Sequence, residues 1–288
     1  MLGALLVAIG TLSDEIGSSV GKYTIRHRIE RPYTIGLASS VAGLAGILAI
    51  GLFFPTHFFG PGFPGGFTFA LVSLPTLVPR IILEIVQSHV TLLALVRAER
   101  STFAFIRVLT IPLLLLVDVA FGYSMSTYQM VGILCIAAGL LLILFRSHGI
   151  ARKGAGLTLF TALNAVLTIS LYKYDITYFN SVEAEQAIVL FVIVAYFVIM
   201  AHYKKERPLA HLLHPAERTQ LLSGIIANTT LSFSFLYLQP SVATAGRRGL
   251  SGLWALGAGA FYFKEKHIVV KAVTLCLTIG GIVLLTLQ

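Results

Sequence analysis

Several charged side chains stand inside long apolar stretches of this sequence. They include Asp14, Glu15, Glu84, Arg107, Asp118 and Arg247. A charge in hydrocarbon is costly, so such residues usually face a polar cavity, contact a substrate or ion, or pair with one another. Two roles are therefore open for each residue: contact with a substrate or coupling ion, and a structural ion pair.

The carboxylates Asp14 and Glu15 lie within the first apolar stretch, beside a stripe of small residues. The stripe repeats at spacings of four and three: Gly3, Val7, Gly10, Asp14, Gly17 and Gly21. Residues so spaced share one face of a helix, and small residues allow helices in membranes to approach closely. Asp14 is therefore expected to face either a closely packed helix or a cavity.

Arg107 and Asp118 are eleven residues apart, close to three helical turns, which places them on one face about 16 Å apart. Pro112 lies between them and should kink the helix. For Arg107 and Arg247 three roles are open: a gate or anion-binding group, an ion-pair partner, or a side chain that snorkels to the interface. Arg248 is turned about 100° from Arg247. It is expected to point elsewhere and only to snorkel.

Uncharged polar residues add to these candidates. Glu84 and Ser88 share a helical face, and His89 is turned about 100° from it. For His89 a hydrogen-bonded packing role is favoured over a proton relay. The predicted helix 219–238 carries a second polar stretch, Asn228-Thr229-Thr230, at the same depth as Glu84 and Ser88 in the predicted helix 78–97. Asn164 is a candidate hydrogen-bond donor to a substrate. Polar groups at matched depth in two helices favour a substrate cavity.

The sequence contains no recognisable motif for nucleotide binding, metal binding or catalysis. Gly21-Lys22 is followed by Tyr23, so there is no phosphate-binding loop. There is also no HExxH, no nucleophile elbow and no cluster of Cys and His ligands. We therefore expect no cofactor, no metal site and no enzymatic activity. The net charge of +9 could indicate a nucleic-acid partner, but the basic residues stand in short breaks between apolar segments, so none is expected.

The elements that must position these residues are helices that cross a membrane. Of the 288 residues, 57% are hydrophobic and 11% charged, and the mean hydropathy is +0.88. A crossing helix needs about 20 apolar residues. We predict an all-α integral membrane protein with ten transmembrane helices, near 2–20, 34–53, 78–97, 101–121, 127–145, 155–172, 184–202, 219–238, 241–262 and 268–287. Residues 54–77 are rich in Gly and Pro. Their apolar part, 67–77, should either extend the third helix or form a re-entrant segment.

Basic residues set the expected orientation. Sixteen Lys and Arg residues fall in alternate loops on one side, beginning with the loop at residues 21–33, whereas the loops on the other side carry only Lys173. Positively charged loops stay in the cytoplasm. We therefore expect a multi-pass protein of the cell membrane (inner or plasma membrane) with both termini outside the cytoplasm.

The two halves of the chain resemble each other. A shift of 151 residues places Lys22-Tyr23 on Lys173-Tyr174, and a shift of 140 places Arg107 on Arg247. The matches define two five-helix repeats, 1–146 and 147–288. Five is an odd number of crossings, so the repeats must be inverted. Inverted repeats indicate alternating access, with the site near the middle of the membrane.

Four segments of the second repeat form a recognisable pattern: 237–245, 249–259, Phe261-Tyr262-Phe263-Lys264-Glu265-Lys266 and Gly280-Gly281-Ile282-Val283-Leu284-Leu285. This pattern resembles the end of a repeat in the EamA-like family, which belongs to the drug/metabolite transporter superfamily. The resemblance implies ten helices, a central cavity and transport of small metabolites. The first repeat departs from the pattern, because residues 123–126 stand where an acidic-basic turn is usual, and the expected orientation of the termini also differs from that of many relatives.

We predict a secondary-active transporter that moves a small polar or zwitterionic metabolite, similar to an amino acid, by alternating access. The lipid bilayer surrounds it, and a proton or ion is a possible coupling partner. The mixture of acidic and basic candidates suits an amphoteric substrate. The alternatives are an intramembrane enzyme, an intramembrane lipid or drug flippase, a multidrug exporter, and a membrane scaffold that transports nothing.

Overall fold

The structure is a computed structural model. It describes residues 2–53, 66–98, 103, 106–120, 126–146, 152–206, 215–261 and 268–286. These residues form helices, turns and short connections, and no strand occurs among them. The helices are α1 (Leu2–Arg26), α2 (Pro32–Phe53), η2 (Leu71–Ser73), α3 (Leu74–Arg97), α5 (Thr110–Ala120), α6 (Thr127–Arg146), α7 (Arg152–Tyr178), α8 (Val182–Tyr203), α9 (Pro215–Tyr237), α10 (Pro240–Phe261) and α11 (Ile268–Thr286).

The all-helical prediction is confirmed for the described residues, and helices occupy the predicted ranges except for a break within 101–121. Four stretches are long and apolar enough to cross a membrane: Pro32–Phe53, Leu71–Arg97, Gly154–Tyr178 and Val182–Tyr203. Large apolar side chains are exposed on the outer surface, for example Phe53 at 77% and Val269 at 77%. These features fit a helical membrane protein, whereas the count of ten spans stays a prediction.

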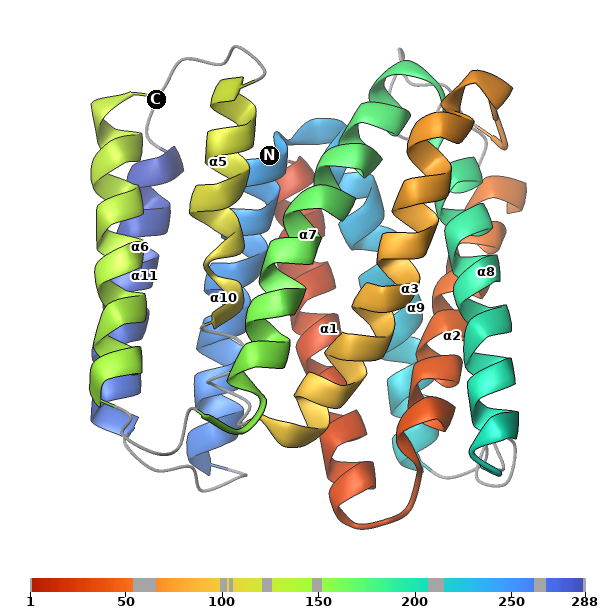
Figure 1. Ribbon diagram of the computed structural model, residues 1–288, viewed down its shortest axis with the longest axis horizontal. Coiled ribbons are helices and arrows are strands. Elements are labelled where there is room, and N and C mark those ends of the chain that lie inside the picture. Colours follow the sequence, from red (N-terminus) through yellow and green to blue (C-terminus); the bar gives the residue numbers. More distant parts are fainter. Residues whose placement is uncertain are drawn as a thin grey trace.

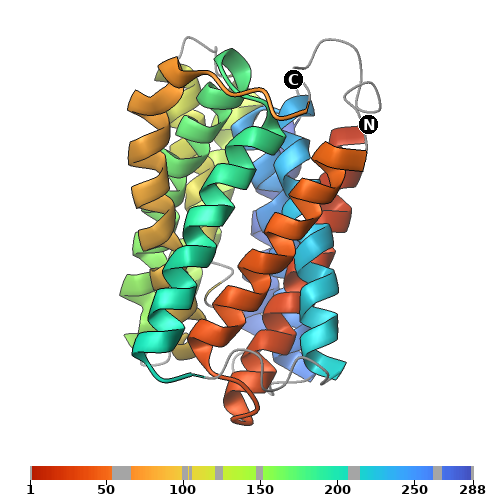
Figure 2. The ribbon, with the colours of Figure 1, turned by 90° about the vertical axis from the view of Figure 1, so that its right-hand side faces the viewer.

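The helices form one bundle, with both chain ends at the upper end in Figure 1. From there α1, α3, α6, α8 and α10 run toward the lower end, and α2, α5, α7, α9 and α11 run back. The closest packing partners are α1 with α9, α3 with α7, α2 with α8, and α6 with α11. The pair α2 and α8 forms one side of the bundle (Figure 2), and α6 with α11 forms the opposite side.

The small-residue stripe of α1 lies against α9. A Cβ atom added at Gly10 would stand 2.4 Å from Thr230 Oγ1, and one at Gly17 would stand 2.6 Å from Ser223 Oγ. Neither contact leaves room for a methyl group. Glycine at these positions therefore allows the close approach of α1 and α9, as the spacing predicts.

The apolar stretch 67–77 extends the third helix through its residues 71–77. Leu71–Ser73 form a 3₁₀ turn that continues into α3. The preceding residues are extended and bind the turn between α7 and α8: Ser181 N donates to Thr68 O at 2.9 Å, and Ala70 N donates to Asn180 Oδ1 at 3.0 Å. The first of the two alternatives for 67–77 therefore holds. Residues 54–65 lie outside the described part of the chain.

The prediction of one continuous helix over 101–121 is wrong. A turn at Val108 and Leu109 separates Arg107 from α5. Pro112 has no N–H to donate to Val108 O, which instead accepts from Ile111 N at 2.9 Å. Thr110 Oγ1 donates to Arg107 O at 2.7 Å and supports the break. Pro112 thus interrupts the helix instead of kinking it, and Arg107 and Asp118 do not share one helical face.

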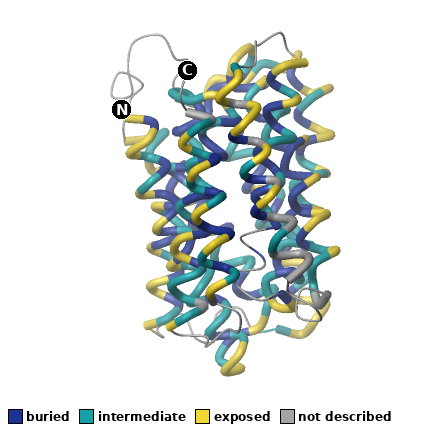
Figure 3. The backbone as a smooth tube through the Cα atoms, turned by 90° about the vertical axis from the view of Figure 1, so that its left-hand side faces the viewer, coloured by how far each residue is buried: buried dark blue, intermediate teal, exposed yellow. Residues whose placement is uncertain are grey.

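The buried positions lie on the sides of the helices that face the interior of the bundle (Figure 3). One apolar cluster gathers side chains of α1, α2, α7, α8, α9 and α10 toward the upper end. Its buried members are Val7, Ile47, Tyr172, Ile176, Val182, Leu190, Phe233, Phe235 and Ala243. We call it the upper cluster. It joins helices from both halves of the chain.

Candidate functional site

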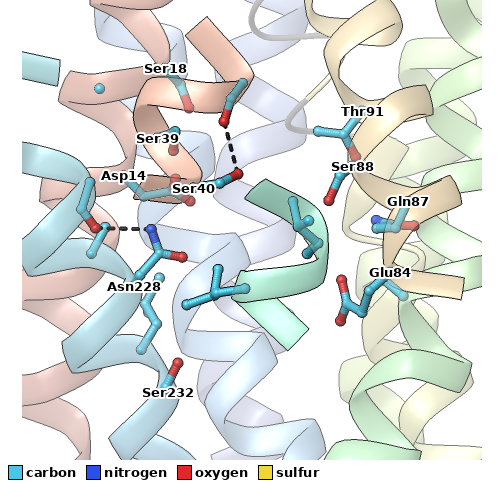
Figure 4. Close-up of a pocket in the computed structure, with 18 of the residues that line it drawn as sticks. Asp14, Ser18, Ser39, Ser40, Glu84, Gln87, Ser88, Thr91, Asn228 and Ser232 are labelled. Carbon is cyan, nitrogen blue, oxygen red and sulfur yellow. Dashed lines mark hydrogen bonds between the residues drawn. The ribbon is translucent and has the colours of Figure 1, made fainter. Parts of the chain in front are cut away.

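A cavity of about 380 Å³ lies between the two halves of the chain. From the first half it is lined by α1, α2, α3 and the segment that contains Arg107, and from the second half by α7, α8, α9 and α10. Figure 4 shows polar side chains on facing walls: Asp14 and Asn228 on one side, Glu84, Gln87 and Ser88 on the other. The predicted residues that line it are Asp14, Glu15, Glu84, Ser88, Arg107, Asn228 and Arg247.

The α1 carboxylates bind α10. Arg247 Nη2 donates to Asp14 Oδ2 at 2.7 Å, and these two side chains are 28% and 37% exposed. Glu15 is buried and accepts a hydrogen bond from the Ser251 hydroxyl. Asp14 therefore forms an ion pair and also lines the cavity, whereas its contact with a substrate or coupling ion stays a prediction. The half-exposed pair remains within reach of water.

The α3 wall carries the third carboxylate. Glu84 accepts a hydrogen bond from the Thr168 side chain, and Arg80, Arg107 and Arg247 lie close enough to act on its charge. Ser88 follows one turn later on the same wall, as the spacing predicts. This wall therefore presents an acidic group and a hydroxyl to the cavity.

The α9 wall is polar without charge. Asn228 Nδ2 donates to Gly224 O at 2.9 Å, one turn earlier in its own helix. Its side-chain oxygen remains available as an acceptor toward the cavity. Ser232 lies one turn further along the same wall (Figure 4). Asn228 is thus placed where the matched-depth argument predicts.

Arg107 and Arg248 line the cavity as well as Arg247. Arg107 has its guanidinium carbon 5.2 Å from the centre of the Phe103 ring, a cation–π contact. Arg248 is only 3% exposed and also lines the cavity. The expectation that Arg248 points elsewhere and snorkels is therefore wrong. α10 packs against α1, and both arginines line the cavity despite the turn of about 100° between them.

Three predicted residues lie outside the cavity lining. His89 Nδ1 bonds the Tyr196 hydroxyl, and its ring lies 5.8 Å from that of Tyr33, which agrees with the packing role. Asp118 accepts hydrogen bonds from Ser241, near the start of α10. Asn164 Nδ2 donates to Leu83 O and to Gln87 Oε1, each at 2.9 Å. Asn164 therefore orients a lining residue and does not itself face the cavity.

Sequence reasoning missed a buried ion pair. Arg80 of α3 binds Glu185 of α8, and the two side chains are 2% and 0% exposed. Asn180 Nδ2 donates to Glu185 Oε2 at 2.6 Å, and the Arg80 guanidinium carbon lies 4.4 Å from the centre of the Tyr172 ring. Arg80 and Tyr172 also line the cavity. Opposite charges near the upper ends of two helices were the available signal, but Glu185 in a first turn is equally typical of a helix terminus.

The described part of the chain contains no cluster of side chains that could bind a metal ion. No three residues among His, Cys, Asp and Glu gather there as metal ligands. Cys135 and Cys276 are free, and Cys276 is exposed on α11. Cys135 is partly buried on α6, so neither cysteine is fully buried.

No family model matches the chain, and no curated protein matches it. The resemblance to EamA-like proteins therefore stays a prediction that rests on the segments quoted above.

Proposed function

We propose that this protein is a secondary transporter of the EamA-like kind, built from two inverted five-helix repeats in the cell membrane. It moves a small polar or zwitterionic metabolite, similar to an amino acid, and performs no chemical step on it. One observation carries the proposal: a cavity lined by charged side chains from both halves of an apolar helical bundle. A polar cavity within a membrane protein marks a path for a polar solute.

The packing partners support the repeat. Exchanging the halves replaces α1 by α7, α2 by α8, α3 by α9, α5 by α10 and α6 by α11. The exchange turns the pair α1–α9 into α7–α3, and it turns the pairs α2–α8 and α6–α11 into themselves. Each exchanged helix also runs in the opposite direction to its counterpart (Figure 1). Inverted repeats would produce this pattern.

A pair of lysines supports the same assignment at atomic detail. Lys22 Nζ donates to Ala98 O at 2.6 Å, at the end of α3. Its counterpart Lys173 Nζ donates to Phe235 O at 2.7 Å, near the end of α9. Lysines commonly bind the last carbonyl groups of a helix. Here equivalent lysines bind the ends of equivalent helices at opposite ends of the bundle.

The cavity charges favour an amphoteric solute. Asp14, Glu15 and Glu84 contribute negative charge. Arg107, Arg247 and Arg248 contribute positive charge, whereas Arg80 is neutralised by Glu185. A solute with both an acidic and a basic group finds partners on facing walls. The volume is near the lower end of the range for small-molecule sites, about 300–1,000 Å³.

The upper cluster supports a state that is closed at the upper end. Tyr172 and Phe235 fill the space there, together with the Arg80–Glu185 pair beside them. Their repeat counterparts at the lower end are the smaller residues Gly21 and Leu95, which line the cavity. With the basic loops in the cytoplasm, this state opens toward the cytoplasm.

Transport into proteoliposomes tests the proposal. Purified protein is reconstituted without ATP and offered radiolabelled amino acids, nucleosides and cationic dyes. We expect saturable uptake of at least one amino acid above that of empty liposomes. Uptake of dyes alone would favour the multidrug exporter, and lipid scrambling without solute uptake would favour the flippase.

A further inference from the structure

Arg248 is a buried cation that lines this cavity. Its side chain belongs to a residue that is 3% exposed, and no group in the described part of the chain hydrogen-bonds its Nε atom. A buried donor atom without a hydrogen bond is destabilising, and an evolved fold usually supplies a partner or a ligand for it. Arg248 lines the cavity, so a ligand bound there can reach it.

Charges of both signs surround Arg248. Arg107 and Arg247 act on Arg248 as like charges, and Asp14 and Glu15 act on it as opposite charges. Asp14, however, accepts a hydrogen bond from Arg247, and Glu15 accepts one from the Ser251 hydroxyl. The guanidinium groups of Arg107, Arg247 and Arg248 therefore lie close together on the side of the cavity formed by α10.

We infer that Arg248, assisted by Arg107, is the subsite for the carboxylate of the transported molecule. A guanidinium offers a planar fork of donors that matches a carboxylate, and the hydrogen bonds so formed are charge-assisted. The inference rests on the proposed function and assigns one end of the substrate. Glu84 on the α3 wall then faces the basic end of the same molecule.

Arg80 and Arg247 are less suited to this role. Arg80 is held by Glu185 and covered by the Tyr172 ring, and Arg247 is held by Asp14. Binding a substrate carboxylate through either would first require breaking an ion pair. Arg248 requires no such exchange, which is why we assign the carboxylate to it.

Binding to the purified full-length protein tests the assignment. The protein has a single tryptophan, Trp254 on α10, whose fluorescence follows thermal unfolding. The probes are the standard amino acids, their methyl esters, chloride and inorganic phosphate. We expect at least one amino acid to raise the Tm, and its ester to need about 10- to 100-fold more ligand, because a charge-assisted hydrogen bond is lost.

Arg248→Gln should remove the preference for acid over ester, and Arg248→Lys should retain part of it because the charge remains. Arg26→Gln, an exposed residue in the last turn of α1, is the matched control and should bind as the native protein does. The inference is overturned if acid and ester bind alike, if the preference survives in Arg248→Gln, or if chloride or phosphate replaces the carboxylate with equal effect.

Flux through proteoliposomes separates this inference from the proposed function. Uptake of amino acids and their esters at equal rates would support the proposed transport function and would refute the carboxylate subsite at Arg248. Carboxylate binding that depends on Arg248, with no flux of any probe, would support the subsite and overturn the transporter.

Discussion

Removing the charge of Glu185 should destabilise the protein strongly. Glu185 and Arg80 are 0% and 2% exposed, so water cannot replace a lost partner. In Glu185→Gln the guanidinium of Arg80 stays buried over the Tyr172 ring without its counter-charge. Removing one member of a buried ion pair costs about 3–5 kcal/mol.

That cost translates into a measurable shift of the unfolding midpoint. For chains of 150–250 residues, 1 kcal/mol lowers the Tm by about 2–4 °C. We therefore expect Glu185→Gln to unfold about 6–20 °C below the native protein in detergent. Fluorescence of Trp254 during heating provides the measurement, and Arg26→Gln, an exposed arginine, serves as the control.

The double variant Arg80→Met with Glu185→Leu separates the pair from its surroundings. Replacing both partners by apolar side chains is often neutral or stabilising, because no charge remains buried. We expect the double variant to recover most of the lost Tm. If Glu185→Gln unfolds like the native protein, or if the double variant is as unstable as the two single changes combined, the buried pair does not have the stabilising role assigned to it.

Three further outcomes follow from the site and the topology. A reporter active only outside the cytoplasm, fused after the last residue, should be active, and activity of a cytoplasmic reporter alone would refute the orientation. The double variant Asp14→Asn with Glu15→Gln should still fold but should abolish uphill transport, because both cavity carboxylates of α1 lose their charge. Unchanged uphill transport in this variant would rule out a coupling role for the two carboxylates. His89→Phe should lower the Tm by about 1–6 °C through loss of the bond to Tyr196, with transport within about twofold of native, since such a loss leaves the cavity untouched. A tenfold fall in transport would instead favour a proton relay.

The helices and most of the cavity could be predicted from the sequence, because apolar length and helical spacing are local properties. Glu84 and Ser88 share a wall as their spacing requires, and Asn228 stands on the facing helix. Small residues at Gly10 and Gly17 indicated a close helix contact, which proves to be with α9. These features depend on one helix at a time.

The predictions that were wrong or missing concern tertiary contacts between helices. Arg248 seemed to point away from Arg247, but the packing of α10 between other helices brings both into the cavity. Asp118 carries a charge at a plausible depth, yet it binds Ser241 outside the cavity. The Arg80–Glu185 pair joins residues 105 positions apart in the sequence. No spacing rule connects positions so distant without knowledge of the tertiary contacts.

Two-sided cysteine labelling tests alternating access most directly. Ser18 of α1 and Ser232 of α9 line the cavity toward its lower and upper ends, respectively. Each is replaced singly by Cys in a protein that carries Cys135→Ala and Cys276→Ala, and membrane-impermeant reagent is added from either side. Glu185→Gln weakens the closure at the upper end. We predict that it raises labelling at position 232 from the upper side and lowers labelling at position 18 from the lower side. Labelling that rises at both positions, as in an open channel, or that changes at neither, would contradict alternating access.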